Sequence, residues 1–313
     1  MLKRFISILL LCFLLFLCSC TENKDHSEGA VTFTDALGRE VSVSEKPKRV
    51  AALIGSFADI WMLSGGEICA TADDAWEDFG LSLDGAVNVG GAHSPNLELL
   101  ISSEPEFVIA SASTASNVEM KDTLDAMGIP VAYFDVDNFE DYLSMLKICT
   151  DITGRKDLYE QNGLAIKRQI DQIKASYQNA EIPAHERKVL LLRAASTFVK
   201  AKGSEGTVLG EMLRDMGCIN IADSDKSLLE SLSVEAVIRE DPHHIFVVAM
   251  GSDTEKAKNT LEKMIGENPA WSTLDAVKSG RLHIMDKKLF NLKPNARFAE
   301  AYETLAVILQ KTD

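Results

Sequence analysis

Short apolar runs alternate with helical patterns in both halves of this chain, and one long amphipathic stretch lies between the halves. Runs such as residues 49–54 and 245–249 have the length and the continuous apolar character of strands that are buried on both faces. Helical patterns, several of them ending in glycine, separate the runs. This order predicts two parallel sheets, each covered by helices on both faces.

The expected strands fall into two groups. In the first half they are residues 49–54, 67–70, 107–110 and 129–134. In the second half they are residues 188–192, 198–201, 245–249 and 281–285, and a helix over 296–309 closes the chain.

The stretch between the halves predicts one long helix. Tyr159, Ile166, Ile170, Ile173 and Tyr177 keep the three-and-four spacing that places side chains on one stripe of a helix. A helix over residues 156–177 would be about 33 Å long, at about 1.5 Å per residue. The fold class is therefore α/β, with two doubly wound lobes bridged by one long α-helix. We expect an N-terminal lobe over 30–138, a connecting helical segment over 139–180 and a C-terminal lobe over 181–313.

The amino terminus has the composition of an export signal. Residues 1–4 contain two basic side chains, and the apolar run over 5–17 is too short for a typical membrane span. The run ends at Cys18-Ser19-Cys20, where a small residue precedes a cysteine, as in a bacterial lipobox. We therefore expect a signal peptide over 1–19, lipidation of Cys20, and a polar tether over 20–29. An ordinary secretory signal or a single-pass anchor remains the alternative.

Charge and cysteine content narrow the function further. The formal net charge is −15, which argues against binding to nucleic acid or to anionic lipid. Beyond the signal, Cys69, Cys149 and Cys218 are widely spaced and odd in number. They predict buried thiols without a disulfide framework.

Catalytic motifs are missing from the sequence. It contains no GxSxG nucleophile elbow and no GxxxxGK phosphate loop, and no GxGxxG follows the first strand. His185-Glu186 lacks the second histidine of an HExxH site, and the neighbours His243 and His244 would point to opposite faces of a strand. An exported binding protein without cofactor or resident metal is the better prediction than an enzyme.

Several segments resemble one family when they are taken in order. They are residues 33–41 (FTDALGREV), 46–50 (KPKRV), 89–91 (VGG) with 95–98 (PNLE), 104–109 (EPEFVI), 268–271 (NPAW) and 277–282 (VKSGRL). Together they resemble the helical-backbone (class III) periplasmic-type binding proteins of ABC importers, in the branch that serves ferric siderophores, haem and cobalamin. The resemblance covers essentially the whole chain after the signal.

The resemblance implies a ligand cleft between the two lobes and a modest rocking motion on closure. It also implies a partner, an ABC permease dimer with its ATPase subunits, bound through one acidic residue on each lobe. Asp59 and Glu211 take those positions here, although the family more often has Glu at the first. We expect the binding protein itself to be a monomer that meets the membrane only through its lipid anchor.

Strand ends and the loops beyond them supply the candidate ligand-binding residues. They are Ser56, Phe57, Trp76, His93, Arg193, Met250, Phe290, Asn291 and Arg297. Aromatic walls with a few cations suit a large, anionic, partly apolar chelate. Salt bridges are the alternative role for the two arginines, and an ordinary surface histidine is the alternative for His93.

A ferric siderophore is the leading ligand. Haem, for which His93 could supply an axial nitrogen, and a corrinoid such as cobalamin remain alternatives. From a different class, the protein could be a surface receptor without a permease. We expect it on the outer side of the plasma membrane, whether the envelope has one membrane or two.

Overall fold

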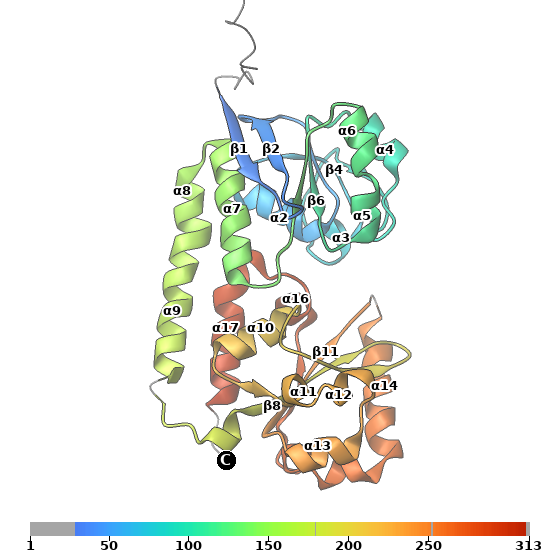
Figure 1. Ribbon diagram of the computed structural model, residues 1–313, viewed down its shortest axis with the longest axis vertical. Helices are drawn as coiled ribbons and strands as arrows, with labels where there is room; N and C mark the ends of the chain where they lie inside the picture. The colour runs from blue at the N-terminus through green and yellow to red at the C-terminus, as the bar shows by residue number, and fades with distance from the viewer. Residues whose placement is uncertain (1–28, 179, 252, 311–313) are drawn as a thin grey trace, which may run out of the picture.

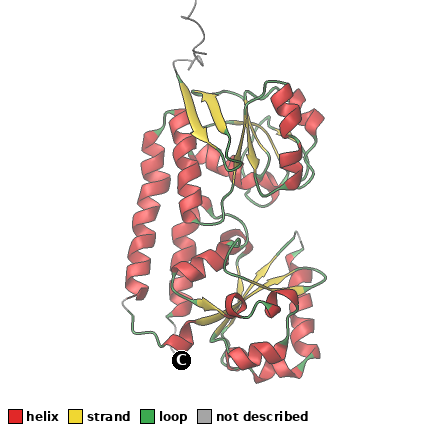
Figure 2. Cartoon of the chain, in the orientation of Figure 1, coloured by secondary structure: helices red, strands yellow, loops and turns green. Residues whose placement is uncertain are grey.

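The computed structural model describes residues 29–178, 180–251 and 253–310. They form two α/β lobes, and a group of long helices runs along one side of both lobes (Figures 1 and 2). Each lobe has its own sheet of mainly parallel strands, covered by helices. The predicted fold class, two doubly wound lobes joined by a long helix, is confirmed.

The N-terminal sheet has the strand order β5-β4-β3-β6-β7, with all neighbours parallel. Its strands are β3 (Val50–Ala52), β4 (Ile68–Thr71), β5 (Val87–Asn88), β6 (Phe107–Ser111) and β7 (Val131–Phe134). Its helices are α2 (Gly55–Leu63), α3 (Asp74–Glu77), α4 (Leu97–Ser102), α5 (Ala115–Glu119) and α6 (Lys121–Ala126). The chain therefore starts at the central strand and winds outward in both directions.

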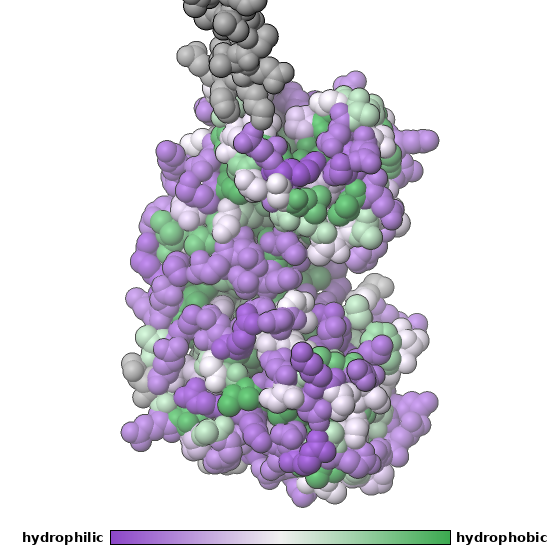
Figure 3. Space-filling view, viewed as in Figure 1, coloured by the Kyte–Doolittle hydropathy of each residue, from purple (hydrophilic) through white to green (hydrophobic). Residues whose placement is uncertain are grey.

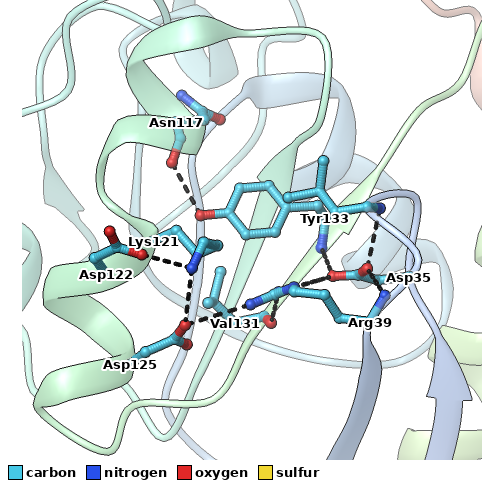
Figure 4. A network of polar contacts seen from close by, with 9 residues as sticks. Asp35, Arg39, Asn117, Lys121, Asp122, Asp125, Val131 and Tyr133 are labelled. Atoms are coloured by element: carbon cyan, nitrogen blue, oxygen red, sulfur yellow. Dashed lines mark hydrogen bonds and ion pairs between the residues drawn. The ribbon is translucent and has the colours of Figure 1, made fainter.

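An antiparallel hairpin of β1 (Ala30–Thr34) and β2 (Glu40–Ser44) precedes this sheet. Asp35, in its turn, accepts hydrogen bonds from Arg39 Nε at 3.0 Å and Nη2 at 2.7 Å. Arg39 also donates to the Val131 carbonyl at 2.8 Å and lies 4.9 Å above the ring of Tyr133 (Figure 4). These contacts fasten the hairpin to β7, so this polar network has a structural role.

The C-terminal sheet has the order β10-β8-β11-β12, and β9 pairs antiparallel with the later half of β8. Its strands are β8 (Lys188–Ala194), β9 (Val199–Lys202), β10 (Ile219–Asn220), β11 (His244–Ala249) and β12 (Leu282–Met285). The α-helices are α10 (Val208–Asp215), α11 (Ile221–Ser224), α12 (Ser227–Glu230), α13 (Val234–Glu240), α14 (Thr254–Glu267), α15 (Asp275–Lys278) and α16 (Lys287–Phe290). The 3-10 turns are η2 (Ala184–Arg187), η3 (Pro269–Thr273) and η4 (Asn295–Arg297).

We call the helices on the closed side the spine. They are α7 (Phe139–Thr153), α8 (Lys156–Tyr159), the π-helical turn η1 (Glu160–Leu164), α9 (Ala165–Gln178) and α17 (Phe298–Leu309). Because α8, η1 and α9 follow one another without a break, they form the predicted long helix. Gly154 ends α7 in the left-handed conformation, with φ of 74°.

The π-helical turn joins the spine to the N-terminal lobe. Asn162 donates to the Leu63 carbonyl at the end of α2 at 2.7 Å, and its own carbonyl accepts from the Tyr142 hydroxyl at 2.7 Å. Gly163 sits so close to α7 that a Cβ there would lie 2.8 Å from a Leu143 methyl carbon. This close approach explains why the long helix has a glycine in its first half, because a larger residue would contact Leu143 too closely.

One apolar core runs from the N-terminal lobe through the spine into the C-terminal lobe, and each lobe adds a smaller cluster on the outer face of its sheet. Cys149 and Cys218 are buried, Cys69 is half-buried, and all three thiols are free, as predicted. Among the described residues, no helix has both the length and the apolar character that a membrane crossing requires.

Candidate functional site

The two sheets present their carboxyl ends to a common cleft, on the side of the molecule away from the spine. Figure 1 shows α3 on the face of the N-terminal lobe that looks toward the other lobe, with α16 opposite. Figure 3 shows the surface hollowed between the lobes on this side. A cavity of about 440 Å³ opens there, and its apolar wall consists of Val247, Leu261, Ile284 and Met285.

The charged lining of this cavity comes almost wholly from the C-terminal lobe. Its members are Asp78, Glu255, Lys258, Asp286, Lys287 and Lys288. Asp78 alone belongs to the N-terminal lobe, and Lys287 Nζ lies 2.7 Å from Asp78 Oδ1. The Asp286 carboxylate accepts from the backbone N–H groups of Lys288 and Leu289, so it caps α16. An apolar wall with both signs of charge at its rim suits a polar ligand with an organic body.

Three cations lie together on β8 and β9, and we call them the cation group. Arg193 pairs in register with Lys200 of β9, and Lys202 lies two residues further on the same face. Arg193 Nε is buried without a hydrogen-bond partner, and among the described residues no carboxylate lies within ion-pair distance of any of the three. Burial lowers the pKa of Arg193, and burial together with the charges of Arg193 and Lys200 lowers that of Lys202. The cation group therefore favours an incoming anion.

The opposite wall, on the N-terminal lobe, is acidic. Asp74 accepts from the Gly55 N–H with both carboxylate oxygens at 2.9 Å. Burial, with the neighbouring charges of Asp73 and Asp78, raises the pKa of Asp74. The carboxylate thus caps α2, and Ser56 lies buried in the first turn of that helix without capping it.

Four of the predicted ligand-binding residues are engaged by other parts of the protein. Phe57 is fully buried and packs edge-on against Phe134, and Phe290 is 2% exposed in the same core. Ser56 is 5% exposed, and its carbonyl accepts from Asn295. Arg297 is bound through Nε and Nη2 to Glu300 at 2.7 and 2.8 Å. The expectation that Ser56, Phe57 and Phe290 line the cleft is corrected, because they are buried, and the ion pair with Glu300 argues against the ligand contact predicted for Arg297.

The remaining candidates lie nearer the strand ends. Trp76 is half-buried in α3, and Met250 follows β11 with its N–H bound to the Ala194 carbonyl at 2.8 Å. His93 is exposed in a loop near Gly90, and the Gly90 carbonyl accepts a hydrogen bond from the Asp73 N–H at 2.9 Å. Asn291 is half-buried at the end of α16. Their contacts with a ligand stay predictions, as do those of Arg193.

The two residues expected to dock on a permease do not offer free carboxylates. Asp59 Oδ2 accepts from Asn295 Nδ2 at 2.8 Å, a contact between the N-terminal lobe and the turn η4 that precedes α17. Glu211 has 10% of its side chain exposed and forms an ion pair with Arg214. Both carboxylates are therefore engaged within the protein itself, and their role in docking stays a prediction.

A histidine group, which the local sequence pattern does not indicate, lies at the other end of the C-terminal lobe. His243 lies between His185 and His244 in space, and His244 Nδ1 is 3.0 Å from His283 Nε2. These histidines are scattered in the sequence but adjacent in the fold. Among the described residues, no group of three or more histidine, cysteine or acidic side chains has the arrangement of a metal site.

Comparison with known proteins adds three results. Residues 50–289 match the sequence model of the family described as periplasmic binding protein. The chain is 26% identical over 295 residues to the Fe(3+)-citrate-binding protein YfmC of Bacillus subtilis, with 90% of this chain and 87% of that protein covered. It is also 24% identical over 313 residues to a putative ABC transporter substrate-binding lipoprotein of the same organism, YhfQ, with 95% and 94% covered.

Solved structures give the same fold. Staphylococcus aureus SirA complexed with staphyloferrin B matches with a TM-score of 0.69 at 21% identity, over 89% of this chain and 98% of that one. S. aureus IsdE complexed with haem matches with a TM-score of 0.66 at 15% identity, over 84% and 99%. Because proteins with such different ligands share the fold, the fold alone does not select a ligand.

Proposed function

The chain belongs to the periplasmic binding protein family, and from that membership we propose that it captures an anionic ferric chelate for an ABC importer. Its relatives are substrate-binding proteins of ABC transporters, which bind a solute and carry out no chemistry on it. A receptor that works without a permease is the alternative, and the genes beside this one would separate the two.

The observation that carries the choice of ligand is the cation group. The chain has a formal charge of −15, so an anion approaching it is repelled unless local cations reverse the sign. Arg193, Lys200 and Lys202 supply such a reversal on β8 and β9, and Arg193 lies next to the carboxyl end of β8, where ligands of parallel sheets bind. The Fe(3+)-citrate of the relative YfmC is a carboxylate chelate of this kind. A neutral corrinoid would leave the three cations without a partner.

The test is a titration of the purified protein with a panel of ligands, in which tryptophan fluorescence reports binding. Ferric citrate, a ferric tricatecholate, a neutral ferric trihydroxamate, haem and cobalamin make up the panel. We expect the anionic ferric chelates to bind at least about tenfold more tightly than the neutral one, a difference of about 1.4 kcal/mol. Preference for cobalamin or the neutral hydroxamate would contradict the proposal, and preference for haem would point to the second candidate ligand, with His93 as the nitrogen to test.

The anchor belongs to the same proposal, although residues 1–28 lie outside the described part of the chain. We propose that Cys20 carries the lipid and holds the protein on the outer side of the membrane, as the lipoprotein name of the relative YhfQ suggests. Cys20→Ala should release the protein from membranes or leave its signal uncleaved. Retention on the membrane with the signal removed would contradict the assignment.

A further inference from the structure

One ion pair joins the two lobes directly across the cleft. Lys287 Nζ of α16 lies 2.7 Å from Asp78 Oδ1, at the end of α3, and the two residues are 209 positions apart. Within the described ranges, every other ion pair stays inside one lobe or involves the spine. The side chains are 15% exposed for Lys287 and 29% for Asp78. The pair is thus partly shielded from solvent, and it stands at the rim of the 440 Å³ cavity.

Three lysines line this cavity, Lys258, Lys287 and Lys288, and among the described residues only Lys287 forms an ion pair with the other lobe. Lys258 is 46% exposed on the surface of α14, where its Nζ lies 4.0 Å from Glu262. The carboxylate nearest along the chain, Asp286, is engaged as the cap of α16 and accepts from the Lys288 N–H at 2.6 Å. Lys287 is held beside the apolar wall and is neutralised by a residue from the other lobe. Its partner would have to move if a ligand filled the space between the lobes.

From this geometry we infer that Lys287 is a ligand-contacting cation, and that an anionic group of the ligand displaces Asp78 from its pair with Lys287. The inference rests on the proposed function and names a residue that selects the charge of the ligand. Exchange of one carboxylate for another keeps Lys287 paired, so the partly buried ammonium group is not left without a counter-charge. Asp78, the more exposed partner, can return to water.

The exchange also discriminates against neutral ligands. A neutral chelate that enters the same space either leaves the Asp78–Lys287 pair in place, and loses contact area, or breaks the pair without replacing it. Breaking a partly buried pair without replacement is unfavourable, because a charge is left desolvated. Selectivity would then come from an unfavourable contribution to the binding free energy of a neutral chelate as well as a favourable contribution to that of an anionic one.

Four variants test the exchange by titration with ferric citrate as the anionic probe and a ferric trihydroxamate as the neutral probe. Asp78→Asn removes the competing charge with little change of shape, so ferric citrate should bind about threefold to tenfold more tightly. Lys287→Met should lose about tenfold or more of that affinity, and Lys287→Arg should keep most of it. In the double variant, Asp78→Asn should give no gain, because the cation for which the carboxylate competed is gone.

Lys263→Met, on the exposed side of α14, serves as the matched control and should bind ferric citrate like the parent protein. Thermal melts of all variants identify any that fail to fold. If Lys287→Met fails to fold, Lys287→Arg still tests the inference. If the parent binds ferric citrate while Lys287→Met binds equally well, or Asp78→Asn binds less tightly, the inference is wrong and the proposed function stands. If the parent binds neither ferric citrate nor any other anionic chelate, the proposed function fails and the inference fails with it.

Discussion

At the scale of single residues, two arginines with similar places in the sequence have different surroundings in the fold. Arg193 ends a strand and keeps a buried Nε without a partner. Arg297 precedes a helix, and Glu300, three positions later, binds it through two hydrogen bonds. Spacing of three or four residues on a helix brings such pairs together, so the sequence itself contained the signal that Arg297 is engaged.

This contrast gives a prediction for ligand affinity. Arg193→Ala should weaken binding of an anionic ferric chelate about tenfold to a hundredfold, because a charge-assisted contact contributes about 1.5–3 kcal/mol. Arg193→Lys should restore only part of the affinity, since lysine lacks the planar fork of guanidinium. Arg297→Ala is the matched control and should change affinity less than about threefold. Equal losses for both alanine variants, or none for Arg193→Ala, would remove the main support for an anionic ligand.

The sequence predicted strand ends better than it predicted side-chain burial. Position after a strand selected Trp76 and Met250, which are half-buried, but the same rule also selected Phe57 and Phe290, which pack in the core. An aromatic residue that follows a strand can point either way, and only the packing of the neighbouring helices decides which. Lys200 and Lys202 were missed because their meaning depends on β9 folding back beside Arg193.

At the scale of elements, the alternation of apolar runs and helical patterns was a reliable guide. Each of the eight expected strands is present, with ends that differ by a few residues. The hairpin of β1 and β2 was not anticipated, although β2 alternates exposed and buried residues as a one-sided strand does. The helical region before β7 is divided at Met120 into two short helices, α5 and α6. Short pieces of this kind lack the length over which periodicity can be recognised.

The start of α2 gives a prediction about packing between elements. A Cβ on Gly55 would lie 2.6 Å from the Ala75 nitrogen and 2.7 Å from its Cα, and backbone atoms cannot move aside cheaply. Gly55→Ala should therefore destabilise the protein by about 1–3 kcal/mol, the usual effect of overpacking. Gly266→Ala is the control, because nothing lies within 4 Å of its Cβ and it sits inside α14. That variant should be neutral or stabilised by up to about 1 kcal/mol. Urea unfolding measures both variants, and a Gly55→Ala protein more stable than Gly266→Ala would contradict the prediction.

At the scale of the whole molecule, the end of the chain returns to hold the lobes together. Phe298, the first residue of α17, packs against Phe139 and Tyr142 of α7 with ring centroids 5.4 and 5.7 Å apart. Just before it, Asn295 adopts a left-handed conformation with φ of 51° and donates from Nδ2 to the Ser56 carbonyl and to Asp59. Asparagine tolerates this conformation better than most residues. Such long-range contacts cannot be inferred from local periodicity, so the contact of Asp59 with Asn295 was not predicted.

The last prediction concerns the pH dependence of this contact between lobe and closing helix. Burial raises the pKa of Asp59, and the hydrogen bond from Asn295 opposes that rise only in part. An acid whose pKa is higher in the folded state binds its proton more tightly there. Its stabilising contribution is therefore complete below the unfolded pKa, about 3.9, and is lost as the pH rises through the folded value. At pH 7 the buried carboxylate consequently weakens the junction.

Asp59→Asn keeps the shape and an acceptor for the Asn295 amide but removes the buried charge. The variant should melt at a higher temperature than the parent at pH 7, by about 2–4 °C for each kcal/mol gained, and this advantage should shrink below about pH 4. Glu303→Gln, an exposed carboxylate on α17, is the control and should show no such pH-dependent gain. A lower melting temperature for Asp59→Asn at pH 7 would mean that the charge itself, through Asn295, holds the lobes together. In that case the ionised Asp59 would be a stabilising part of the junction, and loss of uptake in this variant could not be attributed to permease docking alone.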